Sequence, residues 1–212
     1  MNQPAQQDQF IQATDKGDVR IRSFCSPEEI RQFRFNPQFG IHARYRSLYT
    51  KRESLEESAA QTDANVAVAL AEDDLIVGFG MLTYPDAGER WAKLEPRVMM
   101  EVKAVEVARD WRSTGLGEAI IAALLRHPLI DEKIVYIVVC SWTWDLDGTK
   151  KTAQDYRRIL INLFEPFGFI EYQTNEPNIC LKPENLFMGR IGRRVSEDMT
   201  KAFKWLRFGI YD

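Results

Sequence analysis

The segment that most constrains the fold of this chain is residues 101–120, EVKAVEVARDWRSTGLGEAI. An apolar run ends at Ala108, a cationic turn with Arg112 follows, and a helical pattern begins at Gly115. Because Gly115 and Gly117 have no side chains, backbone N–H groups can converge at the helix N-terminus, where the helix dipole favours negative charge. The segment therefore predicts a phosphate-binding loop between a strand and a helix.

Three kinds of phosphate loop compete for this segment. The P-loop is excluded because the chain contains no G-x-x-x-x-G-K-S/T sequence. The dinucleotide fingerprint lacks its third glycine, where Ile120 stands, and an antiparallel meander rather than a βαβ unit is expected before it. The remaining pattern, R/Q-x-x-G-x-G/A, is matched by Arg112, Gly115 and Gly117, and it resembles the pyrophosphate loop of the GNAT superfamily of N-acetyltransferases.

The hydrophobic pattern predicts an α+β fold, a mixed and mostly antiparallel central sheet flanked by helices, with a C-terminal helical tail. The acidic turn at 72–74 predicts a hairpin, and Ser26 with Glu29 forms a capping-box pattern. Residues 38–62 predict a charged helical stretch with Arg46 and Arg52 on a solvated face. We expect strands at 19–24, 65–71, 75–83, 98–108, 133–140, 169–174 and 179–182, and helices at 26–33, 115–126, 150–164 and 196–208, the third with Tyr156, Ile159, Leu160 and Leu163 facing inward.

The composition limits the domain organisation and the partners. The chain has 212 residues, 45% of them hydrophobic, which predicts one domain over residues 18–212, including the tail helix, after a flexible leader at residues 1–17. Its net charge of -3 argues against a nucleic-acid partner. The three cysteines are far apart and only two histidines accompany them, so no metal site is expected. No apolar run is long enough to span a bilayer, which predicts a cytoplasmic protein with no membrane partner.

Several further motifs resemble one family within the GNAT superfamily, the AcuA acetoin-utilisation acetyltransferases, over nearly the whole chain. The segment 165–169 also resembles the terminal Y-E-x-x-G-F element of the superfamily. The motifs that carry the AcuA resemblance are residues 89–91 (ERW), 142–148 (WTWDLDG), 174–177 (TNEP), 188–192 (MGRIG) and 206–208 (LRF). The resemblance implies a GNAT fold, acetyl-CoA as co-substrate, and a lysine of acetyl-CoA synthetase as acceptor, so that this synthetase is the expected protein partner.

The resemblance also assigns residues to acetyl-CoA. In the superfamily the pantetheine arm pairs with the strand before the loop, and the loop holds the pyrophosphate. The alternative for the strand residues is an ordinary core strand, which is compatible because pairing uses only backbone atoms. The expected acetyl-CoA-binding residues are Val105, Glu106, Val107, Arg112, Ser113, Thr114, Gly115, Leu116, Gly117 and Glu118.

Attack on a thioester requires a neutral amine, and a free lysine has a pKa of about 10.4. Glu101 lies eleven residues before Arg112, where acetyltransferases of this kind that modify protein lysines carry their base, and burial would raise its pKa toward a useful range. The alternative is an ion pair with Lys103, and Glu106 is the second candidate for the base. Phe164 stands where the superfamily often has a tyrosine acid, but a thiolate leaves readily without one.

Two tryptophans and an aspartate follow the strand at 133–140, a position that faces the acceptor entrance in GNAT folds. Trp142, Trp144 and Asp145 would suit the apolar stem and cationic head of a lysine. A packed loop with Asp-Gly turn chemistry is an equally good interpretation, and Asp145 and Asp147 alone lack the remaining ligands of a calcium loop. The acceptor class therefore stays open between a protein lysine and a small amine, with a non-catalytic acyl-CoA sensor as the third hypothesis.

Overall fold

The computed structural model describes residues 8–41, 49 and 51–210, and it divides the chain into two compact units. The first unit comprises Met1–Thr83 and Lys103–Pro128, and the second comprises Tyr84–Val102 and Leu129–Asp212. Strand β6 (Met99–Val107) begins in the second unit and ends in the first. The expectation of a single domain from 18 to 212 stays a prediction.

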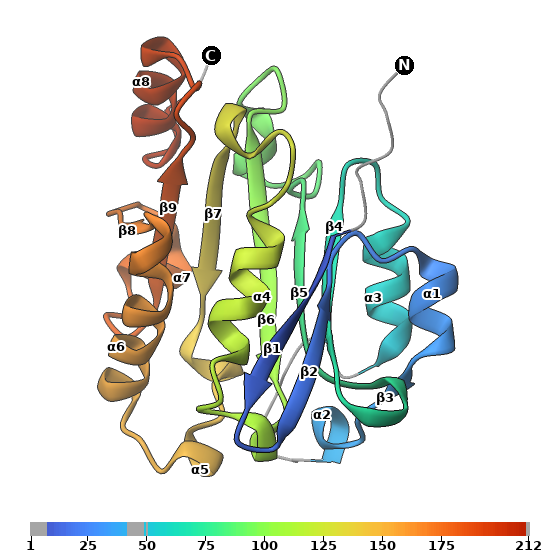
Figure 1. Ribbon diagram of the computed structural model, residues 1–212. Coiled ribbons are helices and arrows are strands. Elements are labelled where there is room, and N and C mark those ends of the chain that lie inside the picture. Colours follow the sequence, from blue (N-terminus) through green and yellow to red (C-terminus); the bar gives the residue numbers. More distant parts are fainter. Residues whose placement is uncertain (1–7, 42–48, 50, 211–212) are drawn as a thin grey trace. The chain divides into compact units, whose positions relative to one another are not determined.

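The first unit contains a mostly antiparallel sheet with helices (Figure 1). Its strand order is β1-β2-β4-β5 and then the end of β6, with β3 pairing in parallel with β5. Its elements are β1 (Gln9–Thr14), β2 (Gly17–Arg22), α1 (Pro27–Gln32), β3 (Arg34–Phe35), α2 (Gln38–Ile41), α3 (Arg52–Ala59), β4 (Asn65–Leu70), η1 (Glu72–Asp74), β5 (Leu75–Thr83), η3 (Arg109–Trp111) and α4 (Leu116–Leu124).

The hairpin of β4 and β5 confirms the predicted acidic turn, whereas the predicted leader is wrong for residues 9–14. Those residues form β1, which pairs antiparallel with the whole of β2. The pairing joins backbone groups, so polar side chains such as those of Gln9 and Gln12 do not prevent it, and the polar composition of the segment concealed the strand. The expected charged stretch contains α2 and α3, while Arg46 lies outside the described residues.

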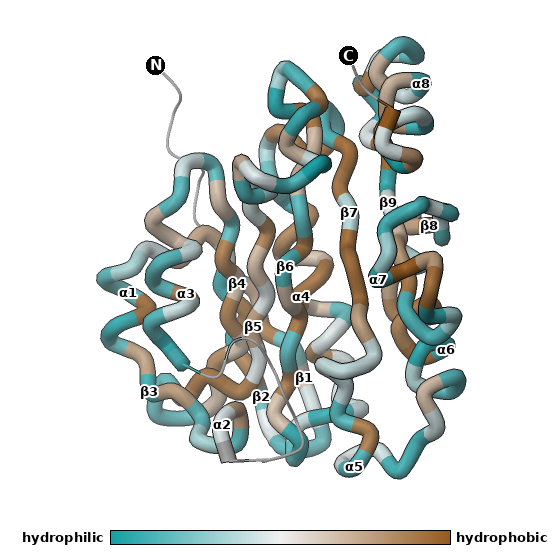
Figure 2. Tube along the Cα trace, turned by 180° about the vertical axis from the view of Figure 1, so that it is seen from behind, coloured by the Kyte–Doolittle hydropathy of each residue, from teal (hydrophilic) through white to brown (hydrophobic). Residues whose placement is uncertain are grey.

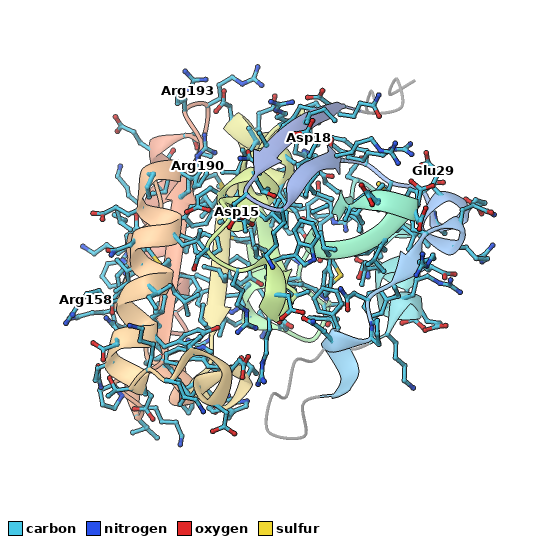
Figure 3. All side chains as sticks on the ribbon, turned by 60° about the horizontal axis from the view of Figure 1, so that its bottom comes forward. Asp15, Asp18, Glu29, Arg158, Arg190 and Arg193 are labelled. Atoms are coloured by element: carbon cyan, nitrogen blue, oxygen red, sulfur yellow. The ribbon has the colours of Figure 1, made fainter. Side chains whose placement is uncertain are left out.

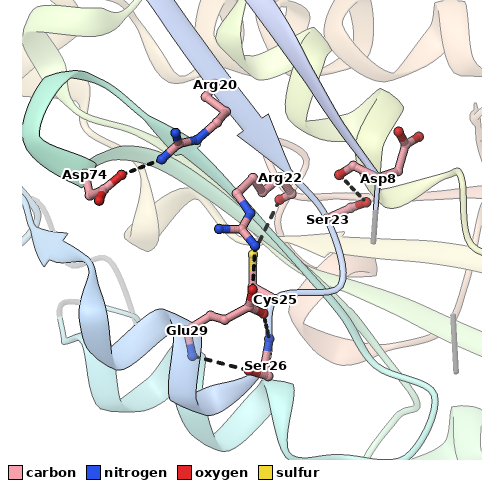
Figure 4. Close-up of polar contacts among 8 residues, drawn as sticks. All are labelled: Asp8, Arg20, Arg22, Ser23, Cys25, Ser26, Glu29 and Asp74. Atoms are coloured by element: carbon pink, nitrogen blue, oxygen red, sulfur yellow. Dashed lines mark hydrogen bonds and ion pairs between the residues drawn. The ribbon is translucent and has the colours of Figure 1, made fainter. Parts of the chain in front are cut away.

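Figure 4 shows how side chains fix the start of α1. The Ser26 hydroxyl accepts a hydrogen bond from the Glu29 N–H at 3.2 Å, and the Glu29 carboxylate accepts from the Ser26 N–H at 2.9 Å. This is the capping box that the sequence predicts. Arg22 on β2 also forms an ion pair with Glu29, so the box ties the helix to the sheet.

Helix α4 packs closely on β4 and β5 because β5 carries glycines beneath it (Figure 1). A Cβ atom at Gly80 would lie 2.6 Å from a methyl of Ile120 and 2.8 Å from a methyl of Leu124. Asn65 is fully buried, and its amide donates to the carbonyl oxygens of Ala123 and Leu124 at 3.1 Å each. Both carbonyls also accept from the N–H groups of Arg126 and His127 in the turn that ends the helix, so Asn65 adds a bond from β4 to each and ties the helix end to the sheet.

The second unit contains a mixed sheet. The start of β6 pairs in parallel with β7 (Ile134–Val139), which pairs antiparallel with β9 (Leu186–Ile191), which pairs antiparallel with β8 (Ile170–Glu171). In Figure 2 the hydrophobic residues run along β7. The remaining elements are η2 (Arg90–Lys93), η4 (Ile130–Glu132), η5 (Ser141–Thr143), α5 (Leu146–Thr149), α6 (Ala153–Phe164), η6 (Glu165–Phe167), α7 (Pro177–Cys180) and α8 (Glu197–Leu206).

Two predictions for the second unit are wrong, and one strand was missed. Residues 179–182 do not form a strand, because Pro177 at a first helical position starts the short helix α7 there. Strand β9 was not expected, because Gly189 and Arg190 interrupt its apolar pattern; Gly189 nevertheless pairs with Tyr136 of β7. In α6, Ile159 is 44% exposed rather than facing inward.

Charged groups join β9 to the segment before β7. Arg190 and Arg193, both labelled in Figure 3, form ion pairs with Asp131 at 3.5 and 2.9 Å. The hydrogen bond from Arg193, followed by the charges of both arginines, lowers the pKa of Asp131. Because Arg193 is largely exposed and Arg190 is not, we expect the Arg190 pair to be less screened by salt.

Candidate functional site

The predicted phosphate loop leaves β6 and bends sharply before α4. Ser113 and Gly115 both adopt left-handed backbone conformations, with φ of 63° and 80°. The Thr114 hydroxyl donates to the carbonyl oxygen of Trp111 at 2.6 Å, and Nε of Arg112 donates to that of Val107 at 3.2 Å. These bonds hold the loop in shape, so its donors are fixed before any ligand binds.

The loop ends at the N-terminus of α4, where Gly115 is the N-cap. The first bond within the helix runs from the N–H of Ala119 to the carbonyl of Gly115 at 3.1 Å. The N–H groups of residues 116–118 therefore have no acceptor inside the helix and point out of its end. Leu116 is buried and anchors the turn, while Ser113 and Glu118 are exposed. This arrangement offers backbone donors and a helix dipole to an anion.

A second basic side chain of the first unit lies close to the loop. Lys16 follows β1, and its Nζ lies 6.0 Å from the centre of the Trp111 ring. Gln12 of β1 also comes near, since its Nε2 would lie 3.5 Å from a Cβ atom at Gly115. Strand β1 thus contributes side chains to the surroundings of the loop, which the prediction of a flexible leader at residues 1–17 did not include.

The strand residues before the loop lie against β5. The N–H of Ala108 donates to the carbonyl of Val77 at 2.9 Å, and the carbonyl oxygen of Glu106 would lie 3.1 Å from a Cβ atom at Gly78. Val105, Glu106 and Val107 are each half-buried, in contrast to the buried Ala104 and Ala108 on either side. The glycine at position 78 is what allows this close approach of the two backbones.

Glu101 lies in the part of β6 that belongs to the second unit, and its neighbour across the parallel ladder is Tyr136 of β7. Directly paired residues of neighbouring strands point to the same face of a sheet. Met99 and Ile134, two residues before these, both belong to the buried aromatic cluster of this unit, which identifies the face. The half-buried carboxylate of Glu101 therefore shares a face with the Tyr136 phenol.

Tyr136 is fully buried between aromatic rings. Its ring lies 5.3 Å from that of Trp91 and 5.6 Å from that of Phe187, centre to centre. Its hydroxyl donates to the carboxylate of Glu89 at 3.3 Å. Burial raises the pKa of Tyr136 strongly, and the negative charges of Glu101, Glu89 and Asp86 raise it further. The phenol thus remains a neutral donor surrounded by carboxylates.

The predicted substrate-binding residues separate into two kinds. Trp142 is 47% exposed, and Nζ of Lys182 lies 5.7 Å from its ring centre. Trp144 is buried and stacks on Tyr156 at 5.1 Å. Asp145 is buried at the N-cap of α5, where its side chain accepts from the Gly148 N–H at 2.9 Å. The packed-loop alternative therefore describes the contacts of Trp144 and Asp145, and substrate contact by the three residues stays a prediction.

Two further residues near the predicted site, Cys140 and Phe164, are packed in the protein interior to different degrees. Burial raises the pKa of the Cys140 thiol to about 11, with a smaller contribution from Glu176, so the thiol is mostly neutral at pH 7. Phe164 is buried against Phe169, with ring centres 5.2 Å apart. Among the residues that the structure describes, no three or more His, Cys, Asp or Glu side chains gather as a metal site. No helix in the described ranges is long and apolar enough to cross a membrane.

The sequence analysis did not identify Tyr136 and Glu89 as neighbours of Glu101. Tyr136 stands inside an apolar run, where an aromatic residue is ordinarily core, and only the register with β6 places it beside Glu101. Glu89 was noted as part of a family motif but not as a neighbour of the proposed base. No local pattern in the sequence marks either residue, because their proximity depends on the fold.

Comparison with known proteins gives a consistent result, although no protein-family profile matches the chain. The Acetoin utilization protein AcuA of Bacillus licheniformis is 30% identical over 195 residues, which is 92% of this chain and 91% of that protein. The crystal structure of an acetoin utilization protein from Exiguobacterium sibiricum is 25% identical, with a TM-score of 0.87 over 96% of this chain and 95% of that one. The GNAT domain of S. lividans PAT is 12% identical, with a TM-score of 0.56 over 86% of this chain and 95% of that one.

Proposed function

Because the chain belongs to the AcuA family of acetoin utilization proteins and has the GNAT fold, we propose that it transfers the acetyl group of acetyl-CoA to a protein lysine. The observation that carries this proposal is the loop from Arg112 to Gly117. Its two left-handed residues turn the chain so that free N–H groups at the start of α4, together with the Arg112 charge, suit a pyrophosphate. Val105, Glu106 and Val107 would offer backbone groups to the pantetheine arm.

In the proposed reaction Glu101 is the base. Its carboxylate takes a proton from the lysine ammonium, and the neutral amine attacks the thioester carbonyl carbon, so that a C–N bond forms. The C–S bond then breaks and the thiolate takes up a proton. A thiol has a pKa of about 8.5, so the thiolate leaves without a dedicated acid, consistent with a phenylalanine at position 164. The net products are acetyl-lysine, CoA and one proton.

The proposed acceptor is a lysine of acetyl-CoA synthetase, which acetylation would inactivate because it removes a positive charge. The exposed Trp142 supports a cationic acceptor, since its ring already lies near the Lys182 ammonium. Trp144 and Asp145 would hold this segment in place rather than contact the lysine directly. Feedback of this kind would link the acetyl-CoA level to the enzyme that makes it.

The test mixes the protein, acetyl-CoA and the synthetase from the same organism, and follows synthetase activity together with acetylated peptides by mass spectrometry. Glu101→Gln should lower the rate about 10²-fold, the usual cost of losing a general base. Glu95→Gln, which removes an exposed carboxylate of the same unit, is the matched control and should retain most of the rate. Acetylation of a small amine such as a polyamine, with the synthetase unmodified, would overturn the protein acceptor, and inhibition without transfer would support a sensor instead.

A further inference from the structure

Three carboxylates influence the Tyr136 phenol, and each is placed differently relative to it. Glu89 accepts the phenol hydrogen bond at 3.3 Å, whereas Glu101 approaches the phenol from the neighbouring strand, as its direct partner in the ladder. Asp86 acts on the same phenol from the segment that carries Glu89. Glu101 and Glu89 thus come from separate parts of the sequence, and the negative charge of each acts on one buried phenol.

We propose that Tyr136 is a positioning residue that keeps Glu89 ionised, so that Glu101 becomes the carboxylate of the pair that takes the acceptor proton. This inference rests on the proposed function, because it names the partners of the proposed base. It assigns Glu89 a second task as well, since its persistent negative charge attracts the lysine ammonium before the proton moves.

The chemistry follows from two opposite effects on proton affinity. A hydrogen bond donated to a carboxylate stabilises its charged form, and the phenol donates to Glu89. A nearby negative charge disfavours the charged form of a second carboxylate, so an ionised Glu89 raises the proton affinity of Glu101. Two carboxylates whose environments differ in this way divide the roles of charged partner and proton acceptor.

The phenol can perform this task because packing fixes it. Phe187 stacks on its ring and Trp91 lies tilted against it. The opposite residue on β9 is Gly189, and its missing side chain makes room for the ring of Tyr172, 3.3 Å from a Cβ atom there. Since burial raises the pKa of Tyr136 well above its ordinary value, the phenol stays protonated throughout the working pH range. Its hydroxyl therefore remains a donor whatever the state of the carboxylates.

Two guanidinium groups lie around this cluster. That of Arg90, beside Glu89, lies 5.7 Å from the centre of the Trp91 ring and forms an ion pair with Glu176 at 3.5 Å, and that of Arg207 lies toward α8. The guanidinium of Arg207 lies 4.6 Å from the centre of the Tyr172 ring and 5.3 Å from that of Phe203. Phe203 in turn lies 6.2 Å from Phe187, so Arg207 reaches the Tyr136 phenol only across the aromatic stack. The groups that act on the phenol are therefore the carboxylates Glu89, Glu101 and Asp86.

The experiment follows each glutamate carboxyl directly by carbon-13 NMR during a pH titration of the whole protein, alongside the pH profile of kcat/KM on a lysine peptide. In the wild type, Glu89 should protonate at lower pH than Glu101. Glu89→Gln should move the titration of Glu101, and the acid limb of kcat/KM, to lower pH by about one unit. Tyr136→Phe keeps the stacked ring, and it should move the titration of Glu89 to higher pH.

The matched control is Glu95→Gln, which removes one exposed negative charge from the same segment and should leave the titration of Glu101 in place. An unchanged Glu101 titration in Glu89→Gln, or an unchanged Glu89 titration in Tyr136→Phe, would overturn the inference. Because the NMR readout does not depend on activity, it distinguishes a failure of the carboxylate coupling from a failure of Glu101 as the base. If Glu101→Gln retains the full rate while the titrations shift as expected, the proposed base is wrong and the coupling of the carboxylates stands.

Discussion

The two units carry different kinds of candidate site. The first presents backbone groups, in a loop whose left-handed residues and helix N-terminus lie within a few residues of one another in sequence. The second presents side chains that come from three separate segments, at Glu89, Glu101 and Tyr136. A site made of backbone groups can therefore be predicted from a local motif. The carboxylate cluster can be recognised only once the register of β6 and β7 is known.

The units also achieve close packing in opposite ways. In the first, Gly80 removes a side chain so that Ile120 and Leu124 of α4 can approach β5. In the second, large rings fill the space, and Trp91 stacks on Phe187 with ring centres 4.6 Å apart. Substitutions that enlarge a side chain should therefore destabilise the first unit most. Substitutions that truncate a large side chain should destabilise the second unit most.

The largest expected effect is that of Trp91→Ala. Truncating a buried aromatic ring costs about 3–5 kcal/mol, from lost burial and the cavity left behind. Trp91 contacts both Tyr136 and Phe187, so the cavity would open in the middle of the aromatic stack. The measurement is chemical denaturation with hydrogen exchange, and protection should fall in β7 and β9.

Trp205→Ala serves as the control for Trp91→Ala, because Trp205 is 52% exposed and its loss should change stability little. If Trp91→Ala lowered protection equally in β4, β5 and α4, the two units would unfold together, and the contrast between them would not extend to stability.

The second effect concerns the loop. Acetyl-CoA at a hundredfold excess over its Kd should stabilise the wild type by about 2.7 kcal/mol, and Gly117→Trp should abolish this gain because the indole would occupy the space of the phosphates. Gly88→Trp is the matched control, since a Cβ atom at Gly88 meets nothing within 4 Å. If folded Gly117→Trp were stabilised by acetyl-CoA as much as the wild type, acetyl-CoA would bind somewhere other than this loop.

The same contrast explains which parts of the molecule could be predicted from the sequence. The hairpin of β4 and β5, the capping box of Ser26 and the strand-loop-helix around Arg112 are local patterns, and the structure confirms all three as elements. Strands β1 and β9 were missed because neither is apolar throughout. Their pairing depends on backbone partners far away in sequence, at β2 and β7.

The candidate site was predictable to the same extent. The loop residues and Glu101 follow from spacing and resemblance, although their functional roles stay predictions. Tyr136 could not be found, because no local pattern tells a buried tyrosine that supports a base from one that only fills space. The buried state of Trp144 and Asp145 was likewise undetermined, since the same Asp-Gly sequence suits a packed turn and an exposed site.

The third effect compares two buried amides. Asn65 in the first unit donates to two carbonyls of α4 and accepts from the Phe24 N–H at 2.9 Å. Asn185 in the second accepts from the Ser141 N–H at 2.7 Å and donates to the Asn178 carbonyl at 2.6 Å. Replacement of either by Ala should cost about 1–3 kcal/mol, because buried partners lose their hydrogen bonds.

Asn65→Ala should be the less harmful of this pair. The Ala123 and Leu124 carbonyls still accept from the N–H groups of Arg126 and His127, so only the Phe24 N–H loses its partner. Asn185→Ala leaves two groups, the Ser141 N–H and the Asn178 carbonyl, without the partner that they have in the folded protein. Hydrogen exchange should report lost protection at the end of α4 in the first variant and around residue 141 in the second. Equal patterns in the two variants would contradict a separate response of the two units.

The smallest effect compares one thiol from each unit. Burial raises the pKa of Cys25 to about 12 and that of Cys140 to about 11, while an unfolded cysteine titrates near pH 8.5. The folded state therefore retains a proton that the unfolded state loses, and the stabilisation present below about pH 8.5 is lost as the pH rises toward the folded pKa. Between pH 7 and pH 9 each thiol should lower the free energy of unfolding by about 0.8 kcal/mol or less.

Cys25→Ala and Cys140→Ala should each flatten this decline by a similar amount, because neither folded thiol ionises at pH 9. The exposed Cys180 provides the control, and Cys180→Ala should leave the slope as it is. A difference between the units should emerge only near pH 11, where Cys140 begins to ionise in the folded state and Cys25 does not. If Cys140→Ala had no effect on the slope at pH 9 while Cys25→Ala did, the thiol of the second unit would already be accessible to water, and the contrast between the units would extend to their response to pH.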